Sequence, residues 1–182
     1  RGIEFGKVLG ASGVQGFFGE GYWYHRPLKP FGLNFQDTTF VAKTTTLHAR
    51  QGNMPLGRDF TPRDLFPGCI VVKPLKGIAL NAVGLSGPGA ETLFEDGRWQ
   101  KRKKPFFLSF MSVAGTPHER KEELASFVRL LEQELPRFSA PIGLQINYSC
   151  PNVGLHAEEL VEEVLEGLET ASVLQIPLMP KF

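Results

Sequence analysis

The sequence contains only two cysteines, Cys69 and Cys150, among its 182 residues. Two are too few for a disulfide framework, and neither has metal-ligand spacing to the other or to a pair of histidines. No apolar run approaches the length that crosses a bilayer, and no signal-peptide pattern opens the chain. The sequence therefore predicts no metal site and no membrane segment, and it favours a reducing, cytoplasmic location.

Net charge is also nearly absent, at +1 at pH 7, so electrostatics gives no reason to expect a nucleic acid or an acidic membrane as partner. The one basic run, residues 101–104, directly precedes apolar residues 105–108 and is typical of a solvated loop. With 42% hydrophobic residues, the chain can bury one substantial core. We therefore expect a single α/β domain over residues 1–182. Because the chain begins with Arg1, the sequence leaves open whether it is a fragment of a longer protein.

Strands and helices are expected to alternate. Short apolar runs that end in glycine, proline or polar residues predict five strands, at residues 7–9, 40–42, 106–111, 142–148 and 176–179. A capping box at Thr116–Glu119 predicts one helix, and a Leu/Val stripe opposite a row of glutamates predicts another from about Ala157. This order implies right-handed crossovers and a parallel sheet with its helices outside. The aromatic segment 17–34 is expected to pack against that sheet rather than to form an interface.

The most informative motif is Asn-Tyr-Ser-Cys-Pro-Asn at residues 147–152, after the apolar run 142–146. A lone cysteine is most often a buried apolar residue. Cys150, however, lies between Asn147 and Asn152, whose amides both donate and accept hydrogen bonds and suit a planar polar ring. A thiol acts as base or nucleophile to the extent that it is a thiolate. The motif therefore predicts an active site.

This motif resembles the active-site segment of the dihydroorotate dehydrogenases, particularly the soluble members that use cysteine as base. Three further segments match the family in its order. They are the turn Gly-Ala-Ser-Gly-Val at residues 10–14, the flavin lysine segment Ala-Lys-Thr-Thr-Thr-Leu at 42–47 with Gly-Asn at 52–53, and the substrate loop Asn-Ala-Val-Gly-Leu at 81–85. The resemblance implies a TIM (β/α)8 barrel with its site at the carboxyl ends of the strands. Here it would be an incomplete barrel covering roughly the first five strands.

The resemblance also implies an oxidoreductase of pyrimidine biosynthesis, which uses FMN to oxidise (S)-dihydroorotate to orotate. Cys150 would remove the C5 proton, with Lys43 also in the catalytic site, while the C6 hydride passes to the flavin. The family's flavin contacts fall on Ala11, Ser12, Gly13, Lys43, Thr44, Asn147 and Lys181. Its substrate contacts fall on Lys43, Asn81, Val83, Gly84, Leu85, Asn147 and Asn152.

Two departures from the family pattern keep alternatives open. Gly87 stands where the family often has asparagine, which puts the substrate in doubt, and Pro180 cannot donate a hydrogen bond within a parallel strand. One alternative is a related pyrimidine-reducing flavoenzyme similar to dihydropyrimidine dehydrogenase, and another is a non-catalytic truncated remnant. The sequence does not distinguish fumarate, quinone or a partner subunit as electron acceptor, and homodimerisation stays open. With about five of eight barrel strands, residues 1–182 alone are expected to be inactive.

Overall fold

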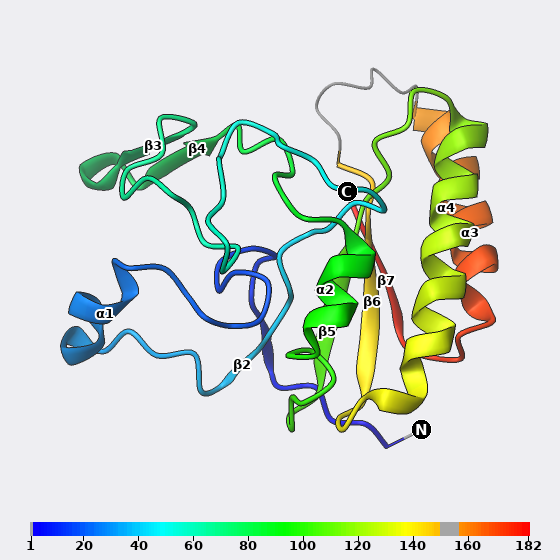
Figure 1. Ribbon diagram of the computed structural model, residues 1–182, viewed down its shortest axis with the longest axis horizontal. Coiled ribbons are helices and arrows are strands. Elements are labelled where there is room, and N and C mark those ends of the chain that lie inside the picture. The colour runs from blue at the N-terminus through cyan, green and yellow to red at the C-terminus, as the bar shows by residue number, and fades with distance from the viewer. Residues whose placement is uncertain (1, 150–156) are drawn as a thin grey trace.

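The computed structural model describes residues 2–149 and 157–182, which form a mixed α/β structure (Figure 1). At its centre lies a parallel sheet of β5 (Phe106–Phe110), β6 (Ile142–Asn147) and β7 (Leu178–Lys181), in that order. Phe106 is the register partner of Ile142, and Leu144 is that of Leu178. The third, fourth and fifth predicted strands are thus confirmed, although β7 begins and ends two residues later than expected.

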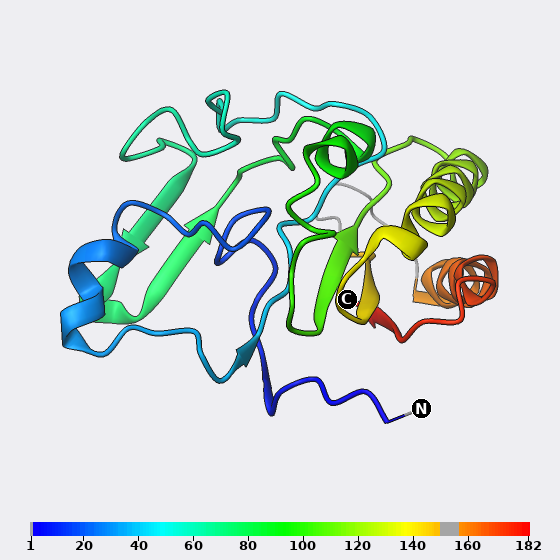
Figure 2. The same cartoon turned by 60° about the horizontal axis from the view of Figure 1, so that its bottom comes forward.

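Two long helices lie side by side along one face of this sheet (Figures 1 and 2). They are α3 (Pro117–Glu134), extended by the 3-10 turn η3 (Leu135–Arg137), and α4 (Ala157–Ser172). The predicted capping box starts α3, because Glu119 N donates to Thr116 Oγ1 and Thr116 N donates to Glu119 Oε2, at 3.2 and 3.0 Å.

The main core lies between the central sheet and these helices. Alternate strand residues face it, and they are Phe106, Leu108, Phe110, Ile142, Leu144 and Ile146. Because successive strand side chains point to opposite faces, Ser109 and Gln145 lie on the face away from α3 and α4. Glu163 was expected on the solvent side of α4, but its carboxylate forms a bidentate pair with Arg120 of α3, with both N–O distances 2.7 Å. That expectation was wrong because a buried arginine on α3 needs an anionic partner.

Two shorter strands extend the parallel set. β1 (Val8–Leu9) pairs with β2 (Thr38–Thr39), and the chain after β2 runs beside β5 through parallel bridges at Val41–Phe107 and Thr45–Phe110. The predicted strand 40–42 is therefore reduced to one bridge within a longer extended segment. The five predicted strands lie next to one another in chain order. Among the described residues they form an open set and no closed barrel.

The other elements escaped sequence analysis because each is short. The hairpin β3 (Ile70–Lys73) and β4 (Ile78–Asn81), with the turn η2 (Pro74–Lys76) between them, and the pair α1 (His25–Leu28) and η1 (Lys29–Phe31) lie far from α3 and α4 (Figures 1 and 2). Helix α2 (Ala90–Asp96) packs into the core through Leu93 and Phe94.

The aromatic segment 17–34 has two environments. Phe17 and Phe18 are buried in the core, as predicted, whereas Trp23 and Tyr24 are exposed. The basic run 101–104 also differs from expectation at one residue. Arg102 is half-buried, and its guanidinium lies 4.0 Å from the centre of the Phe40 ring and donates to Phe18 O.

Pro180 fits β7 because of the side that its nitrogen faces. The carbonyls of Pro177 and Lys181 accept hydrogen bonds from Leu144 N of β6 and from Tyr148 N, directly after β6, at 2.9 and 2.8 Å. Backbone groups alternate along a parallel strand, so the nitrogen of Pro180 points away from β6, towards the edge. The expected conflict therefore does not arise.

None of the described helices combines the length and apolarity that crossing a membrane requires.

Candidate active site

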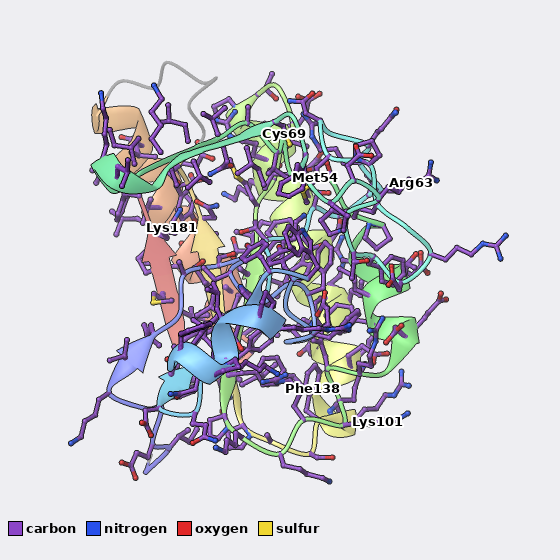
Figure 3. The ribbon with its side chains drawn as sticks, turned by 90° about the vertical axis from the view of Figure 1, so that its left-hand side faces the viewer. Met54, Arg63, Cys69, Lys101, Phe138 and Lys181 are labelled. Atoms are coloured by element: carbon purple, nitrogen blue, oxygen red, sulfur yellow. The ribbon has the colours of Figure 1, made fainter. Side chains whose placement is uncertain are left out.

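The carboxyl ends of the parallel strands meet at one edge of the structure, as parallel strands dictate. Residues 11–13 follow β1, Lys43 and Thr44 follow β2, and Asn147 and Lys181 end β6 and β7. Figure 3 shows Lys181 at the tip of β7. The predicted flavin-contacting residues thus come from four strand ends on this edge.

A β-bulge turns the side chains of Lys43 and Thr44 in different directions. The bridges at Val41–Phe107 and Thr45–Phe110 place four steps of one strand opposite three of the other. One extra residue is therefore inserted, which re-aims side chains, as bulges beside functional sites often do. Thr44 turns towards Ser109, with 2.9 Å between the hydroxyl oxygens. Lys43 directs its own N–H to Gly16 O, 2.9 Å away, instead of to β5.

Four polar side chains form a continuous hydrogen-bonded series across neighbouring strands. Ser12 Oγ donates to Ala42 O at 2.9 Å and lies 2.8 Å from Thr44 Oγ1. Thr44 then contacts Ser109, and Ser109 Oγ lies 2.9 Å from Gln145 Oε1. We refer to Ser12, Thr44, Ser109 and Gln145 as the hydroxyl chain. All but Ser12 are buried, so it leads from the interior to the strand ends.

Lys43 is buried, with 8% of its surface exposed. Its ammonium donates to Ser86 O and lies 4.4 Å from the centre of the Phe17 ring. Burial lowers the pKa of Lys43 from 10.5 to about 8, and the negative charge of Glu20 opposes that shift. The group is therefore a cation that gives up its proton more easily than an exposed lysine does.

Asn147 and Lys181 form a second polar cluster. They are register partners, and Lys181 Nζ donates to Asn147 Oδ1 at 3.3 Å and to Ser149 Oγ at 2.8 Å. Asn147 Oδ1 also accepts from Ser149 N and Ser149 Oγ, at 3.1 and 2.8 Å. Its Nδ2 donates to none of the residues that the structure describes, so it can donate to a ligand carbonyl.

The predicted substrate loop is held by the segment after the lysine. Arg50 and Gly87 exchange two backbone hydrogen bonds of 2.8 Å, and Asn53 N donates to Val83 O at 2.9 Å. Gly52 permits this contact, since a Cβ there would lie 2.7 and 2.8 Å from the carbonyl oxygens of Val83 and Gly84. Its φ of +54° also favours glycine.

Asn81 is placed differently from the rest of the loop. It ends β4, opposite Ile70 in the hairpin, and it is exposed. Leu85 adopts a φ of +58°, unusual for a residue with a side chain, and such strain concentrates at ligand sites. Val83 is half-buried and Gly84 exposed.

Gly87, where an asparagine was expected, has a local cause. A Cβ at this position would lie 3.1 Å from Phe17 Cζ, and the same ring packs against the Lys43 ammonium. A side chain at this position would therefore require the Phe17 ring to shift. Packing against Phe17 favours glycine here.

Apart from the substrate loop 81–85, the polar site side chains among residues 2–149 and 157–182 fall into three groups. The hydroxyl chain, the Lys43–Ser86 contact and the Asn147–Lys181 cluster are each formed, and no hydrogen bond connects one group with another. Cys150 and Asn152 lie outside the described residues.

Sequence analysis missed three residues that hold the site together, namely Ser86, Ser109 and Gln145. A signal was present for two of them. Ser109 and Gln145 are single polar residues inside otherwise apolar strands, Phe-Phe-Leu-Ser-Phe and Ile-Gly-Leu-Gln-Ile-Asn. Buried polar side chains need partners, so such positions indicate a polar network.

This set of donors and acceptors suits the ring edge of a flavin. An ammonium, an amide and two hydroxyls from different strand ends can meet a planar heterocycle of carbonyl and N–H groups. Among the described residues, no three His, Cys, Asp or Glu side chains cluster as metal ligands would.

No model of a protein family matches the chain. The chain is 34% identical over 148 residues to the protein named dihydroorotate dehydrogenase B (NAD(+)), catalytic subunit, of Desulforudis audaxviator (strain MP104C). The match covers 80% of this chain but 38% of that protein's length. On this similarity, and with the four ordered motifs, the chain belongs to the dihydroorotate dehydrogenase family and corresponds to part of the length of its relative.

Proposed function

We propose that this chain forms part of the active site of an FMN-dependent dihydroorotate dehydrogenase, built on roughly the first five strands of a TIM barrel. The observation that carries the proposal is the meeting of Ser12, Thr44, Asn147 and Lys181 at one end of neighbouring parallel strands. A barrel enzyme carries its catalytic groups at this end. The family relationship supplies the reaction, oxidation of (S)-dihydroorotate to orotate in pyrimidine biosynthesis.

FMN, when bound, would supply the hydride acceptor. Lys181 would lie at the N1/O2 edge of the flavin ring, where a cation stabilises negative charge. Its contacts with Asn147 and Ser149 hold it at the strand end for this purpose. Ala11, Ser12, Gly13 and Thr44 would line another edge of the ring, and Gly13 lets the backbone come close because its φ is +86°.

Cys150 would remove the C5 proton of the substrate. A base held within hydrogen-bond reach of that proton increases the rate most. Lys43 would face both substrate and flavin as the family's lysine does. Asn147 Nδ2 would donate to a ring carbonyl, with Asn152 as a second amide. The loop residues Asn81, Val83, Gly84 and Leu85 would close the substrate site.

Dihydroorotate is favoured over other dihydropyrimidines, such as dihydrouracil, because the relative is named as a dihydroorotate dehydrogenase. The contact of a Cβ at Gly87 with Phe17 offers a packing reason for the glycine. A partner subunit is favoured as the route to the electron acceptor, since the relative is named as the catalytic subunit of an NAD(+)-type enzyme. We propose a cytoplasmic protein and leave a homodimer as one form to be tested.

The proposal is tested by adding FMN to the protein that contains this chain and measuring orotate formed from (S)-dihydroorotate. A flavin absorption band with orotate production supports it. A protein that binds no FMN would count in favour of the non-catalytic alternative, and one that oxidises dihydrouracil instead would favour the dihydropyrimidine dehydrogenase-like reading.

A further inference from the structure

The hydroxyl chain contains more contacts than its hydroxyl groups can supply with hydrogens. It has four contacts, from the Ala42 carbonyl through Ser12, Thr44 and Ser109 to Gln145, all between 2.8 and 2.9 Å. Each of its three hydroxyls brings one hydrogen. If Gln145 presents its side-chain oxygen to Ser109, one contact brings two oxygens together without a hydrogen.

The Gln145 amide resolves this conflict when it is turned by half a rotation about its last side-chain bond. Nε2 then takes the place of Oε1 and supplies the fourth hydrogen, and the shape of the side chain is unchanged. In the unturned orientation, the amide makes no compensating hydrogen bond within the protein, because no described residue accepts one from its Nε2. The hydrogen count therefore decides the orientation.

We infer that Gln145 is a positioning residue whose amide donates to Ser109 and so orients every hydroxyl of the chain in one direction. Hydrogens then point from Gln145 to Ser109, to Thr44, to Ser12 and to the Ala42 carbonyl. Thr44 and Ser12 keep one lone pair each, with their hydrogens engaged. A ligand at these two residues is thus met by acceptors, which suits a ring N–H group. This role rests on the proposed function, in which Ser12 and Thr44 contact the flavin ring.

The orientation can be tested without flavin. In 15N-labelled protein, the side-chain amide hydrogens of Gln145 should exchange with solvent far more slowly than those of the exposed Gln36. Ser109→Ala should shift the Gln145 amide resonance and speed its exchange. An amide that exchanges as fast as Gln36, or that Ser109→Ala leaves unchanged, overturns the inference.

The effect on ligand binding needs a control for mere loss of stability. Gln100 is buried to a similar degree, 5% exposed against 6% for Gln145, and its amide donates to Phe94 O and Glu134 away from the hydroxyl chain. Gln145→Leu and Gln100→Leu should both lower the melting temperature. Only Gln145→Leu should weaken FMN binding, by about 3- to 10-fold, the value of one hydrogen bond. Equal weakening in both variants overturns the positioning role.

Gln145→Glu adds a pH signature that a purely structural role would not give. A protonated carboxyl donates to Ser109 as the amide does, whereas the carboxylate only accepts and would reverse the chain. Burial would raise the pKa of this carboxyl, while Lys43, in the segment beside β5, and Lys181, at the end of β7, would lower it.

The FMN dissociation constant of Gln145→Glu should match that of the wild type below this pKa and rise about 3- to 10-fold above it. A ratio that stays constant with pH overturns the inference. If the wild type binds no FMN at all, the proposed function fails, and amide exchange still decides the orientation of Gln145.

Discussion

Asn147 and Lys181 end neighbouring parallel strands as register partners, and the lysine ammonium lies 3.3 Å from the asparagine side-chain oxygen. This pair joins the motif that carries Cys150 to the last strand of the chain. Its position explains how residues 34 apart in sequence can face one ligand.

Lys181→Met should weaken FMN binding by about 10-fold, because one hydrogen bond to a charged group is lost at an exposed position. Lys101→Met is the matched control, since Lys101 is also exposed but lies in the loop before β5 (Figure 3). Titration of the flavin absorbance or fluorescence measures both. An unchanged dissociation constant in Lys181→Met would remove this lysine from the flavin site.

Lys43 should make stability depend on pH. Its pKa is about 8 in the folded chain and 10.5 in the unfolded chain, so the unfolded chain binds more protons between these values. The free energy of unfolding should therefore rise with pH from about 8 to 10.5, by at most about 3 kcal/mol. Below pH 8 the cost of burying the charge is present in full.

Urea unfolding at a series of pH values checks this expectation. Lys43→Met should remove the rise and should be more stable than the wild type at pH 7. Comparing the two proteins cancels the titration of tyrosines and other lysines. Parallel pH profiles for wild type and variant would show that Lys43 is not the group responsible.

In the FMN-loaded protein, Lys43→Ala should weaken both flavin and substrate binding, and loss of only one affinity would contradict its dual role.

Gly52→Ala should displace the loop that carries Val83 and Gly84, because the new Cβ would meet their carbonyl oxygens at 2.7 and 2.8 Å. With the positive φ, we expect a loss of about 1–3 kcal/mol in the free energy of unfolding. Orotate binding should fall as well if this loop closes the substrate site. Gly68→Ala is the control, since nothing lies within 4 Å of a Cβ there. Equal losses of stability in Gly52→Ala and Gly68→Ala would contradict the steric clash at Gly52.

The long helices and strands were predicted from the sequence, whereas most of the short ones were not. Strands β5 and β6 and helix α3 were predictable because their apolar periodicity and capping box act locally. The hairpin β3–β4 and helix α2 carry too few residues for a period to show. The bulge between Val41 and Thr45 was not predictable either, since it depends on the register with β5.

The site divides in the same way. Lys43, Thr44, Asn147 and Lys181 were predicted from motifs, and each follows or ends a strand of the parallel set. Ser109 and Gln145 were missed because their roles arise from contacts between strands that are distant in sequence. The close packing of Phe17 against Gly87 was not predictable either, since the two residues lie 70 apart in sequence. The role of Cys150 stays a prediction from sequence.

Residues 1–182 alone are still predicted to retain FMN poorly and to lack turnover, because the matched region spans 38% of the relative's length. Gel filtration and a visible spectrum of these residues check this. A stoichiometric flavin band with activity would show that this part of the barrel, alone or as a dimer, is sufficient.

Flavin reduction in the FMN-loaded protein that contains this chain tests the central claim most directly. (S)-Dihydroorotate, mixed anaerobically with the wild type, should bleach the flavin absorption band, whereas dihydrouracil should not. Cys150→Ala should retain FMN and bleach roughly a hundred- to ten-thousand-fold more slowly, because a positioned base is lost. An unbleached wild type, or a Cys150→Ala variant that bleaches at the wild-type rate, would contradict the assignment of dihydroorotate oxidation with Cys150 as base.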